Sequence, residues 1–361
     1  MHIKKQVILK KIMLLFLVLY AFLVSINLMS ASFGLFGMDF ANGLFEVTSN
    51  PFVGLFIGIL ATSIIQSSSS TTAIVVGLVA GGVLNLSSAI PIIMGANVGT
   101  SVTNMLVSLA HSSEMAEFRK AFSAAVVHDF FNLLTLIVLF PLEITFHIIE
   151  RSAVFISGFL VGTTATVFSS PMTFFISPVV DFLTVAIFRQ VPAFMFITSL
   201  AVLFISLNAF VRLAKPLAKS EFKHVLHNSL FKTPGTAFIF GICITAFVQS
   251  SSVTTSLVVP LVGVGLLTVR KIYPYVLGAN LGTTVTAILA ALAIGHPVAL
   301  TVALSHLVYN IFGIVLFYPL RRIPIRLALW FSRAVVHSRK HAITYIIFAF
   351  YVVPAAVIFI F

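Results

Sequence analysis

Long runs of apolar residues, separated by short polar or basic segments, make up most of the chain. The runs at 12–29, 118–140, 193–212, 299–320 and 342–361 approach or exceed the roughly 20 residues that a helix needs to cross a membrane. These runs are continuous, whereas the strands of a membrane β-barrel would alternate apolar and polar residues. The pattern therefore predicts an all-α polytopic membrane protein with one full span at each run.

Two further regions are too interrupted to be ordinary spans. A helix over Pro51–Ile65 would be about 22 Å long, less than the roughly 30 Å of the hydrocarbon core. A polar block, Gln66–Thr72, and a second short apolar run follow it, and residues 234–267 repeat this arrangement. We expect a re-entrant helical hairpin in each region, with the polar block at its tip. After each hairpin, at 88–109 and 272–293, we expect a transmembrane helix broken at Gly-Ala-Asn-x-Gly-Thr.

An internal repeat relates the two hairpins. The Gln-Ser-Ser-Ser motif at Gln66–Ser69 recurs at Gln249–Ser252, an offset of 183 residues. At the same offset, the segment Gly95–Thr103 recurs as Gly278–Thr286. A third correspondence, at an offset of 178, comprises the pairs His128 and His306, Asn132 and Asn310, and Pro141 and Pro319. Matches this regular indicate a duplicated unit of roughly 90 residues.

The distribution of charge indicates how the two copies lie in the membrane. Only 8% of the residues are charged and 60% are hydrophobic, which excludes a soluble globular chain. The net charge of +12 comes from basic residues in short loops, which favours the positive-inside pattern over nucleic-acid binding. Lys4 and Lys5 then place the N-terminus inside. The span at 12–29 crosses the membrane once, which places Asp39 and Glu46 outside, so the first repeat starts from the outside. The second repeat starts after Lys232, in a basic segment, and we therefore predict inverted-topology repeats.

Five parts of the chain follow from these patterns. They are a first transmembrane helix with an outer loop (1–49), repeat 1 (50–145), a connecting segment with at least one span and a basic cytoplasmic loop (146–230), repeat 2 (231–322), and a basic cytoplasmic segment with the last span (323–361). Within the connecting segment, loop charge allows both apolar stretches of residues 152–188 to cross the membrane, or neither. We expect a multi-pass protein of a cell inner membrane or plasma membrane, with a cytoplasmic N-terminus.

The polar tips are the candidate binding site. One alternative is that their hydroxyls bond to the preceding helical turn and join neighbouring helices, and another is that the motif glycines serve close helix packing. Duplication of the tips at two short helices favours a site, because irregular backbone at membrane depth survives only when buried in protein or lining a cavity. A helix N-terminus with hydroxyls suits an anion, whereas terminal carbonyls with amide and hydroxyl oxygens suit Na⁺. The candidate anion ligands are Gln66, Ser67, Ser68, Ser69, Gln249, Ser250, Ser251 and Ser252, and the candidate Na⁺ ligands are Gln66, Asn97, Thr100, Gln249, Asn280 and Thr283.

His128 and Asp129 form an ionisable pair within an otherwise apolar run and are further candidates for the site. Asp129 has no acidic counterpart in the second repeat, which favours a local partner over a shared role. An intramembrane hydrolase using Ser67, His128 and Asp129 is the competing interpretation, but duplicated serines do not fit a single nucleophile. We therefore expect a protein that is not an enzyme and has no cofactor. Cys243 is the only cysteine, which excludes an internal disulfide.

These motifs together resemble those of the type II sodium–phosphate cotransporters. The resemblance covers roughly residues 50–145 and 230–350 and rests on Gln66–Ser69, Gly95–Asn104, Arg119–Asn132, Gln249–Val253, Gly278–Thr284 and Tyr318–Leu320. It implies Na⁺-coupled uptake of inorganic phosphate, with the two Gln-Ser-Ser-Ser motifs facing each other across the transport site. Electrogenic animal members carry an Asp where this chain has Gly82, which argues against a third Na⁺. The C-terminal ends of the two first half-helices, one per repeat, are the natural cation positions, and two Na⁺ would balance a divalent phosphate, so we expect electroneutral transport. The long outer loop of the animal members is replaced by a short apolar segment, as is typical of a bacterial member.

We therefore expect a symporter in the lipid bilayer that imports inorganic phosphate by alternating access, with Na⁺ as the co-transported ion. The alternative is the same type of transporter acting on another small anion, a dicarboxylate or sulfate. This alternative stays open because the paired motifs contain no Arg or Lys, and Na⁺ with helix dipoles alone selects poorly among oxyanions.

Overall fold

The computed structural model describes residues 2–36, 42–43, 46–109, 114–161, 171–227, 231–334 and 338–361. Every regular element within these residues is a helix, which confirms the all-α prediction. Six helical stretches of the described chain are long and apolar enough to cross a membrane. Asp39 and residues 162–170 of the ambiguous segment lie outside the described residues.

Each repeat begins with two short arms joined at a glutamine. The arms are α3 (Pro51–Ile65) and α4 (Ser68–Ala80) in the first repeat, and α11 (Pro234–Val248), α12 (Ser251–Ser256) and α13 (Val259–Gly263) in the second. Gln66 and Gln249 both adopt the left-handed backbone conformation, with φ of 60° and 59°, and thereby end the first arm. The predicted pairs of short helices around a polar tip are thus confirmed.

The next helices differ between the repeats. They are α5 (Leu86–Gly99), α6 (Ser101–Leu109) and α7 (Met115–Phe146) in the first repeat, and α14 (Val269–Ile294) and α15 (Pro297–Phe317) in the second. The predicted break in the second repeat is wrong, because α14 is one continuous helix of 26 residues that includes Gly278 and Asn280. In the first repeat the helix is interrupted at Thr100, the last residue of the Gly-Ala-Asn-x-Gly-Thr motif, which agrees with the predicted break. The same motif therefore coincides with a helix interruption in the first repeat but not in the second.

The glycines of this motif allow close contact between each first arm and the following long helix. A Cβ atom added to Gly95 in α5 would lie 2.0 Å from the Leu55 carbonyl oxygen of α3. A Cβ atom added to Gly278 in α14 would lie 2.1 Å from the Phe238 carbonyl oxygen of α11. No side chain fits at such distances, so the motif glycines serve helix packing, which was the alternative explanation for them.

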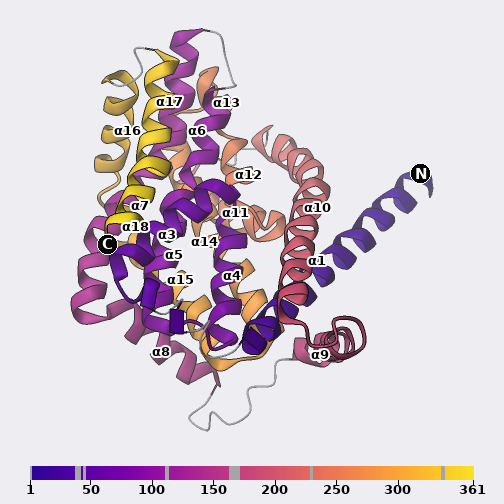
Figure 1. Ribbon diagram of the computed structural model, residues 1–361. Helices are drawn as coiled ribbons and strands as arrows, with labels where there is room; N and C mark the ends of the chain where they lie inside the picture. Colours follow the sequence, from indigo (N-terminus) through magenta and orange to yellow (C-terminus); the bar gives the residue numbers. More distant parts are fainter. Residues whose placement is uncertain are drawn as a thin grey trace.

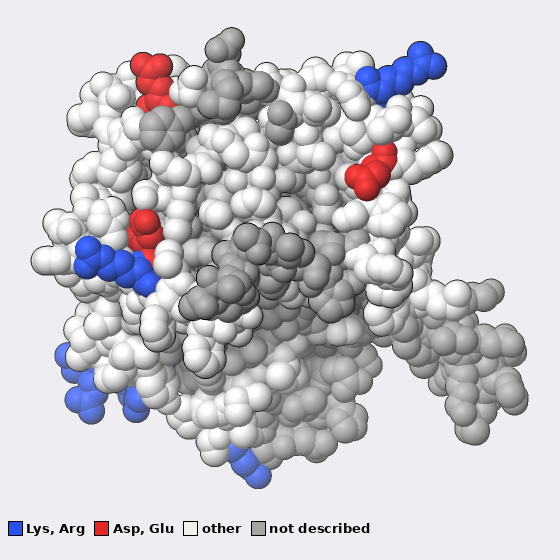
Figure 2. Space-filling view, turned by 90° about the horizontal axis from the view of Figure 1, so that it is seen from below, with Lys and Arg blue, Asp and Glu red and all other residues white. Residues whose placement is uncertain are grey.

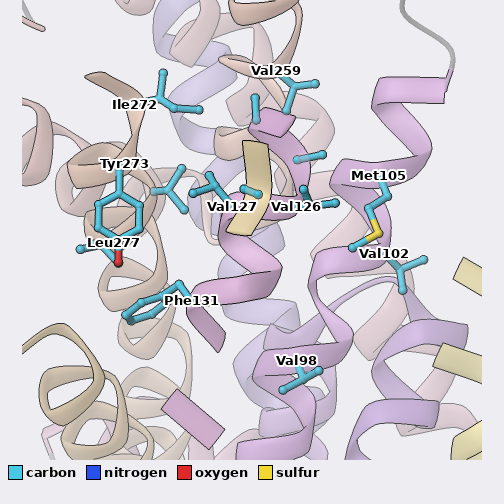
Figure 3. Close-up of a cluster of buried hydrophobic side chains, with 14 of the residues drawn as sticks. Val98, Val102, Met105, Val126, Val127, Phe131, Val259, Ile272, Tyr273 and Leu277 are labelled. Atoms are coloured by element: carbon cyan, nitrogen blue, oxygen red, sulfur yellow. The ribbon is translucent and has the colours of Figure 1, made fainter. Parts of the chain in front are cut away.

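The second arm of each repeat packs against the other repeat. α4 contacts α14 and α15, and α12 and α13 contact α6 and α7. Figure 3 shows part of this shared core, in which Val126 and Val127 of α7 lie between Met105 of α6 and the pair Ile272 and Tyr273 of α14. The tips of the hairpins are therefore positioned by contacts between the two repeats.

The remaining helices surround the repeats (Figure 1). They are α1 (His2–Phe36), α8 (Ile148–Val161), α9 (Pro171–Phe182) continued by η1 (Leu183–Ile187), α10 (Pro192–His227), α16 (Arg322–Ala334), and α17 (Arg339–Ile347) continued by η2 (Phe348–Val352) and α18 (Val353–Ile360). α1 packs along α10, and α16 packs against α7. α8 is only 14 residues long, about 21 Å, which is shorter than the hydrocarbon core.

The ends of corresponding helices point in different directions. Figure 1 shows α8 at the lower end of the molecule and α16 in its upper part. Because α8 directly follows α7 and α16 directly follows α15, these two corresponding spans end toward opposite ends of the molecule. This arrangement supports the inverted topology predicted from loop charge. Among the described residues visible in Figure 2, which views the molecule from below, acidic and basic side chains are scattered rather than clustered.

Two cysteine variants test the inverted topology. Cys243 is exposed, so the background is Cys243→Ala, and Ser87→Cys and Lys271→Cys then place one thiol at each exposed start of α5 and α14. We expect a membrane-impermeant maleimide added to intact cells to label Ser87→Cys, and to label Lys271→Cys only after permeabilisation. Labelling of both thiols from the same side would contradict the inverted arrangement.

Candidate functional site

The two Gln-Ser-Ser-Ser motifs meet between the repeats. The Ser69 hydroxyl of α4 donates a hydrogen bond to the backbone carbonyl of Gln249, at 3.1 Å. Nearby along α12, the Thr255 hydroxyl donates to the side-chain oxygen of Asn104 in α6, at 2.9 Å. Ser69 and Gln249 are only 3% and 4% exposed. The structure therefore brings together the two tips that the sequence repeat relates.

The first serine of each motif caps the second arm. Ser67 accepts a hydrogen bond from the backbone N–H of Ser70 at 3.2 Å, and Ser250 accepts one from that of Val253 at 3.3 Å. Both serines have extended backbone, as N-cap residues do. Their side-chain oxygens are thus already used to begin α4 and α12.

The following serines present polar groups that the protein does not use. Among the described residues, no side chain or backbone group is hydrogen-bonded to the hydroxyl of Ser68, Ser251 or Ser252, although these residues are only 6%, 2% and 5% exposed. The backbone N–H groups of Ser68 and Ser69 also find no acceptor in the described chain, as expected for the first turn of α4. These groups are donors that the described part of the protein leaves unused at the tips.

The two glutamines differ in their contacts although the motifs are identical. The Oε1 atom of Gln66 accepts a hydrogen bond from the Thr103 hydroxyl at 2.8 Å. The corresponding atoms of the second repeat, Oε1 of Gln249 and the Thr286 hydroxyl oxygen, are both buried and have no hydrogen-bond partner within the described part of the chain. Buried oxygens without partners are rare in folded proteins, which makes this pair a candidate position for a cation.

A buried cluster of histidines and asparagines joins the repeats. The Nε2 atom of His128 lies 2.9 Å from Oδ1 of Asn280, and that of His306 lies 3.3 Å from Oδ1 of Asn97. Asn132 connects these pairs, since its amide nitrogen donates to the Asn97 carbonyl and its Oδ1 accepts from the Asn280 amide, both at 2.8 Å. Each histidine therefore contacts the asparagine of the other repeat, and the two predicted Na⁺ ligands, Asn97 and Asn280, have their amide oxygens in protein contacts.

The two predicted threonine ligands bond within their own helices. The Thr100 hydroxyl donates to the Ala96 carbonyl at 2.9 Å, and the Thr283 hydroxyl donates to the Ala279 carbonyl at 3.0 Å. Each hydroxyl oxygen still has lone pairs available to a cation.

Asp129 has a different partner from its neighbour His128. Its Oδ2 atom accepts a hydrogen bond from the Tyr345 hydroxyl of α17 at 2.8 Å, while Oδ1 has no hydrogen-bond partner among the described residues. Asp129 thus links α7 to the last span. Ser67, His128 and Asp129 each bond to a different group and not to one another, so the structure does not assemble the triad that a hydrolase would need.

Several residues of this region were not among the site residues predicted from the sequence. His306, Asn310 and Asn132 belong to the buried cluster, and Thr286 lies in the unpaired position of the second repeat. The signal for the cluster was the correspondence at an offset of 178, which marked both histidines and both asparagines as repeated. Thr286 was visible as the repeat of Thr103.

The fold and the site define a helical multi-pass membrane protein whose two similar halves bring polar helix tips together. The chain belongs to the Na⁺/Pi-cotransporter family, whose model matches residues 21–144 and 202–322. It is 34% identical to sodium-dependent phosphate transport protein 2A of Ovis aries over 97% of this chain and 68% of that protein.

Two further relatives show the same similarity. The chain is 33% identical to sodium-dependent phosphate transport protein 2A of Rattus norvegicus over 94% of this chain and 66% of that protein. It is 32% identical to sodium-dependent phosphate transport protein 2B of Homo sapiens over 96% of this chain and 64% of that protein. The chain thus spans about two thirds of the length of these relatives. No solved structure matches it significantly.

Proposed function

We propose that the protein imports inorganic phosphate together with Na⁺, by alternating access around a central site formed by the two Gln-Ser-Ser-Ser tips. The observation that carries this proposal is the contact between Ser69 and the Gln249 carbonyl, which joins the tips of both repeats. The names of the relatives, sodium-dependent phosphate transport proteins, supply the ions.

The anion would be held by donors rather than by basic side chains. Ser68, Ser251 and Ser252 offer hydroxyls to which no described residue is hydrogen-bonded, and the first turn of α4 adds N–H groups with the positive end of its helix dipole. Gln66, Ser67, Ser69, Gln249 and Ser250 complete the predicted ligand set. Since this set contains no Arg or Lys, co-transported Na⁺ would supply most of the charge compensation.

The cation would first enter at the unpaired oxygens of the second repeat. Oε1 of Gln249 and the Thr286 hydroxyl suit Na⁺, a hard cation that prefers oxygen ligands. In the first repeat, a Na⁺ at Gln66 would have to replace the hydrogen bond from Thr103. Ligation by Asn97, Thr100, Asn280 and Thr283 stays a prediction, and for the two asparagines it would require opening of the contacts with the histidines.

The contacts between the repeats favour alternating access as the mechanism. The tips and the His–Asn cluster are joined across the repeats by individual hydrogen bonds, such as those of Ser69 and of His128. Inverted repeats of this kind are used by many secondary transporters, in which one repeat moves against the other around a fixed site.

Uptake of radiolabelled phosphate into proteoliposomes tests the proposal. We expect uptake with Na⁺ outside, and no uptake above protein-free liposomes when K⁺ or choline replaces Na⁺, because charge compensation at the site depends on Na⁺. Unlabelled phosphate should compete, whereas sulfate and succinate should not. Equal uptake in Na⁺ and K⁺ would contradict Na⁺ coupling, and stronger competition by sulfate or succinate would contradict phosphate as the substrate.

A further inference from the structure

A cavity of about 520 Å³ at one end of the second repeat is lined by four arginines. The lining residues are Arg270, Arg321, Arg322, Arg326, Ile325 and Leu329. Arg270 is the second residue of α14, and Arg321 follows the end of α15 by four residues. Because both helices are candidate spans, the cavity lies where two spans end, at the expected depth of lipid headgroups.

The positive charge of this cavity is not neutralised by any carboxylate of the described residues. Among the described residues, none of its four arginines forms an ion pair with a carboxylate. The first turns of α14 and α16 contain no acidic residue, so the positive ends of two helix dipoles add to the charge of the arginines. A basic residue at a helix N-terminus does not stabilise the helix, so helix stability does not explain Arg270 or Arg322.

The corresponding cavity of the first repeat shows that the fold does not require arginines here. That cavity has a volume of about 210 Å³, and its lining includes Ser87 and Glu143. Ser87 corresponds to Arg270 at the offset of 183, and Glu143 corresponds to Arg321 at the offset of 178. The same position in the duplicated unit is therefore acidic in one repeat and strongly basic in the other.

We propose that the arginine cavity binds the phosphate group of an anionic phospholipid. One guanidinium group can donate two parallel hydrogen bonds to two oxygens of a phosphate. The guanidinium of Arg321 lies over the Tyr318 ring, 5.3 Å from its centroid, and is thereby held in place at the cavity. Exposed apolar side chains directly precede or follow lining residues in the sequence and offer a surface for acyl chains: Leu320, Ile323 and Trp330 are 50%, 44% and 61% exposed. Apolar side chains exposed on the same segment as the arginines favour a lipid over free phosphate, which carries the same recognised group.

Trp330 makes the proposal directly measurable. It is the only tryptophan of the chain and lies on α16, one turn after Arg326. The full-length protein is reconstituted in vesicles of phosphatidylcholine with a minor fraction of phosphatidylglycerol, and one of the two lipids is brominated. Brominated phosphatidylglycerol should quench Trp330 fluorescence more strongly than its mole fraction predicts, whereas brominated phosphatidylcholine should not.

Matched variants separate a site from general attraction to a charged surface. Arg322→Gln/Arg326→Gln removes two cavity arginines and should reduce the preference for phosphatidylglycerol about 30-fold. Arg333→Gln/Lys340→Gln removes the same charge from exposed positions outside the cavity and should keep the preference. Arg322→Lys/Arg326→Lys keeps the charge but loses the paired hydrogen bonds of arginine, so it should show an intermediate preference for phosphatidylglycerol. This lysine variant also tests the proposal if the glutamine variant fails to fold.

Three outcomes would overturn the proposal. Quenching of the unchanged protein in proportion to mole fraction would show that no lipid is selected. An equal loss of preference in both glutamine variants would show surface attraction without a site. Suppression of the phosphatidylglycerol preference by millimolar inorganic phosphate, but not by an equal concentration of chloride salt, would identify free phosphate as the occupant.

Discussion

Ser251→Ala is expected to lose most phosphate uptake while the protein still folds, and Ser68→Ala should behave in the same way. Each hydroxyl is nearly buried at the meeting point of the tips and has no partner among the described residues. Its removal therefore breaks no contact of the protein but takes one donor from the proposed anion site. A hydrogen bond to a charged group contributes about 1.5–3 kcal/mol, so uptake at low phosphate should fall at least about tenfold.

Ser256→Ala is the matched control for this experiment. Ser256 lies at the end of the same short helix, but its hydroxyl donates to the Val253 carbonyl at 2.7 Å and so serves the helix itself. We expect uptake by this variant to stay close to that of the unchanged protein in the same proteoliposome assay. If Ser251→Ala and Ser68→Ala also transport normally, these serines only hold helices together, as the alternative interpretation of the tips states.

The hairpins could be predicted because their signal is local. A 15-residue apolar segment is too short to span, and a polar block directly after it has to be buried in protein. The repeat then strengthened the prediction, since Gln66 and Gln249 end their helices with almost the same φ. Segment length and polarity are properties of neighbouring residues, and the repeat is visible by comparing the sequence with itself, so none of these signals depends on how the chain folds.

The continuous α14 could not be predicted in the same way. Glycine both loosens a helix and allows another backbone to approach it, and the two effects look alike in a sequence. Which effect applies depends on a neighbour from elsewhere in the chain, and for Gly278 this neighbour is Phe238 in α11. The predicted break assumed that glycine loosens the helix. In the structure, the glycine instead allows α11 to pack closely against a continuous α14.

The partners of the polar residues also depend on contacts far apart in the sequence. His128 and Asn280 are separated by 152 residues, and nothing local indicates that each histidine pairs with the asparagine of the opposite repeat. The difference between Gln66, which is bonded to Thr103, and Gln249, which has a free oxygen, arises within identical motifs. Such asymmetry belongs to the conformation of the whole molecule, so the sequence alone could nominate these side chains but not assign their contacts.

Gly95→Ala and Gly278→Ala should each destabilise the folded protein by about 3 kcal/mol or more, the upper part of the range for overpacked interiors. The added Cβ would lie 2.0 Å from the Leu55 carbonyl oxygen in the first case and 2.1 Å from that of Phe238 in the second. A backbone carbonyl cannot rotate away as a side chain can, so the two helices must separate. The temperature at which the detergent-solubilised protein loses its monodisperse peak measures this effect.

Gly158→Ala is the control for these two variants, because replacing glycine by alanine at this exposed position should stabilise the protein instead of destabilising it. Gly158 lies in α8, is exposed, and has no atom within 4 Å of the added Cβ. In a helix, replacing glycine by alanine then gains about 0.5–1 kcal/mol, since the unfolded chain loses conformational freedom. The sign of the change is thus expected to differ between Gly158 and the two motif glycines. If Gly95→Ala and Gly278→Ala were as stable as Gly158→Ala, the close packing of the first arms against α5 and α14 would be refuted.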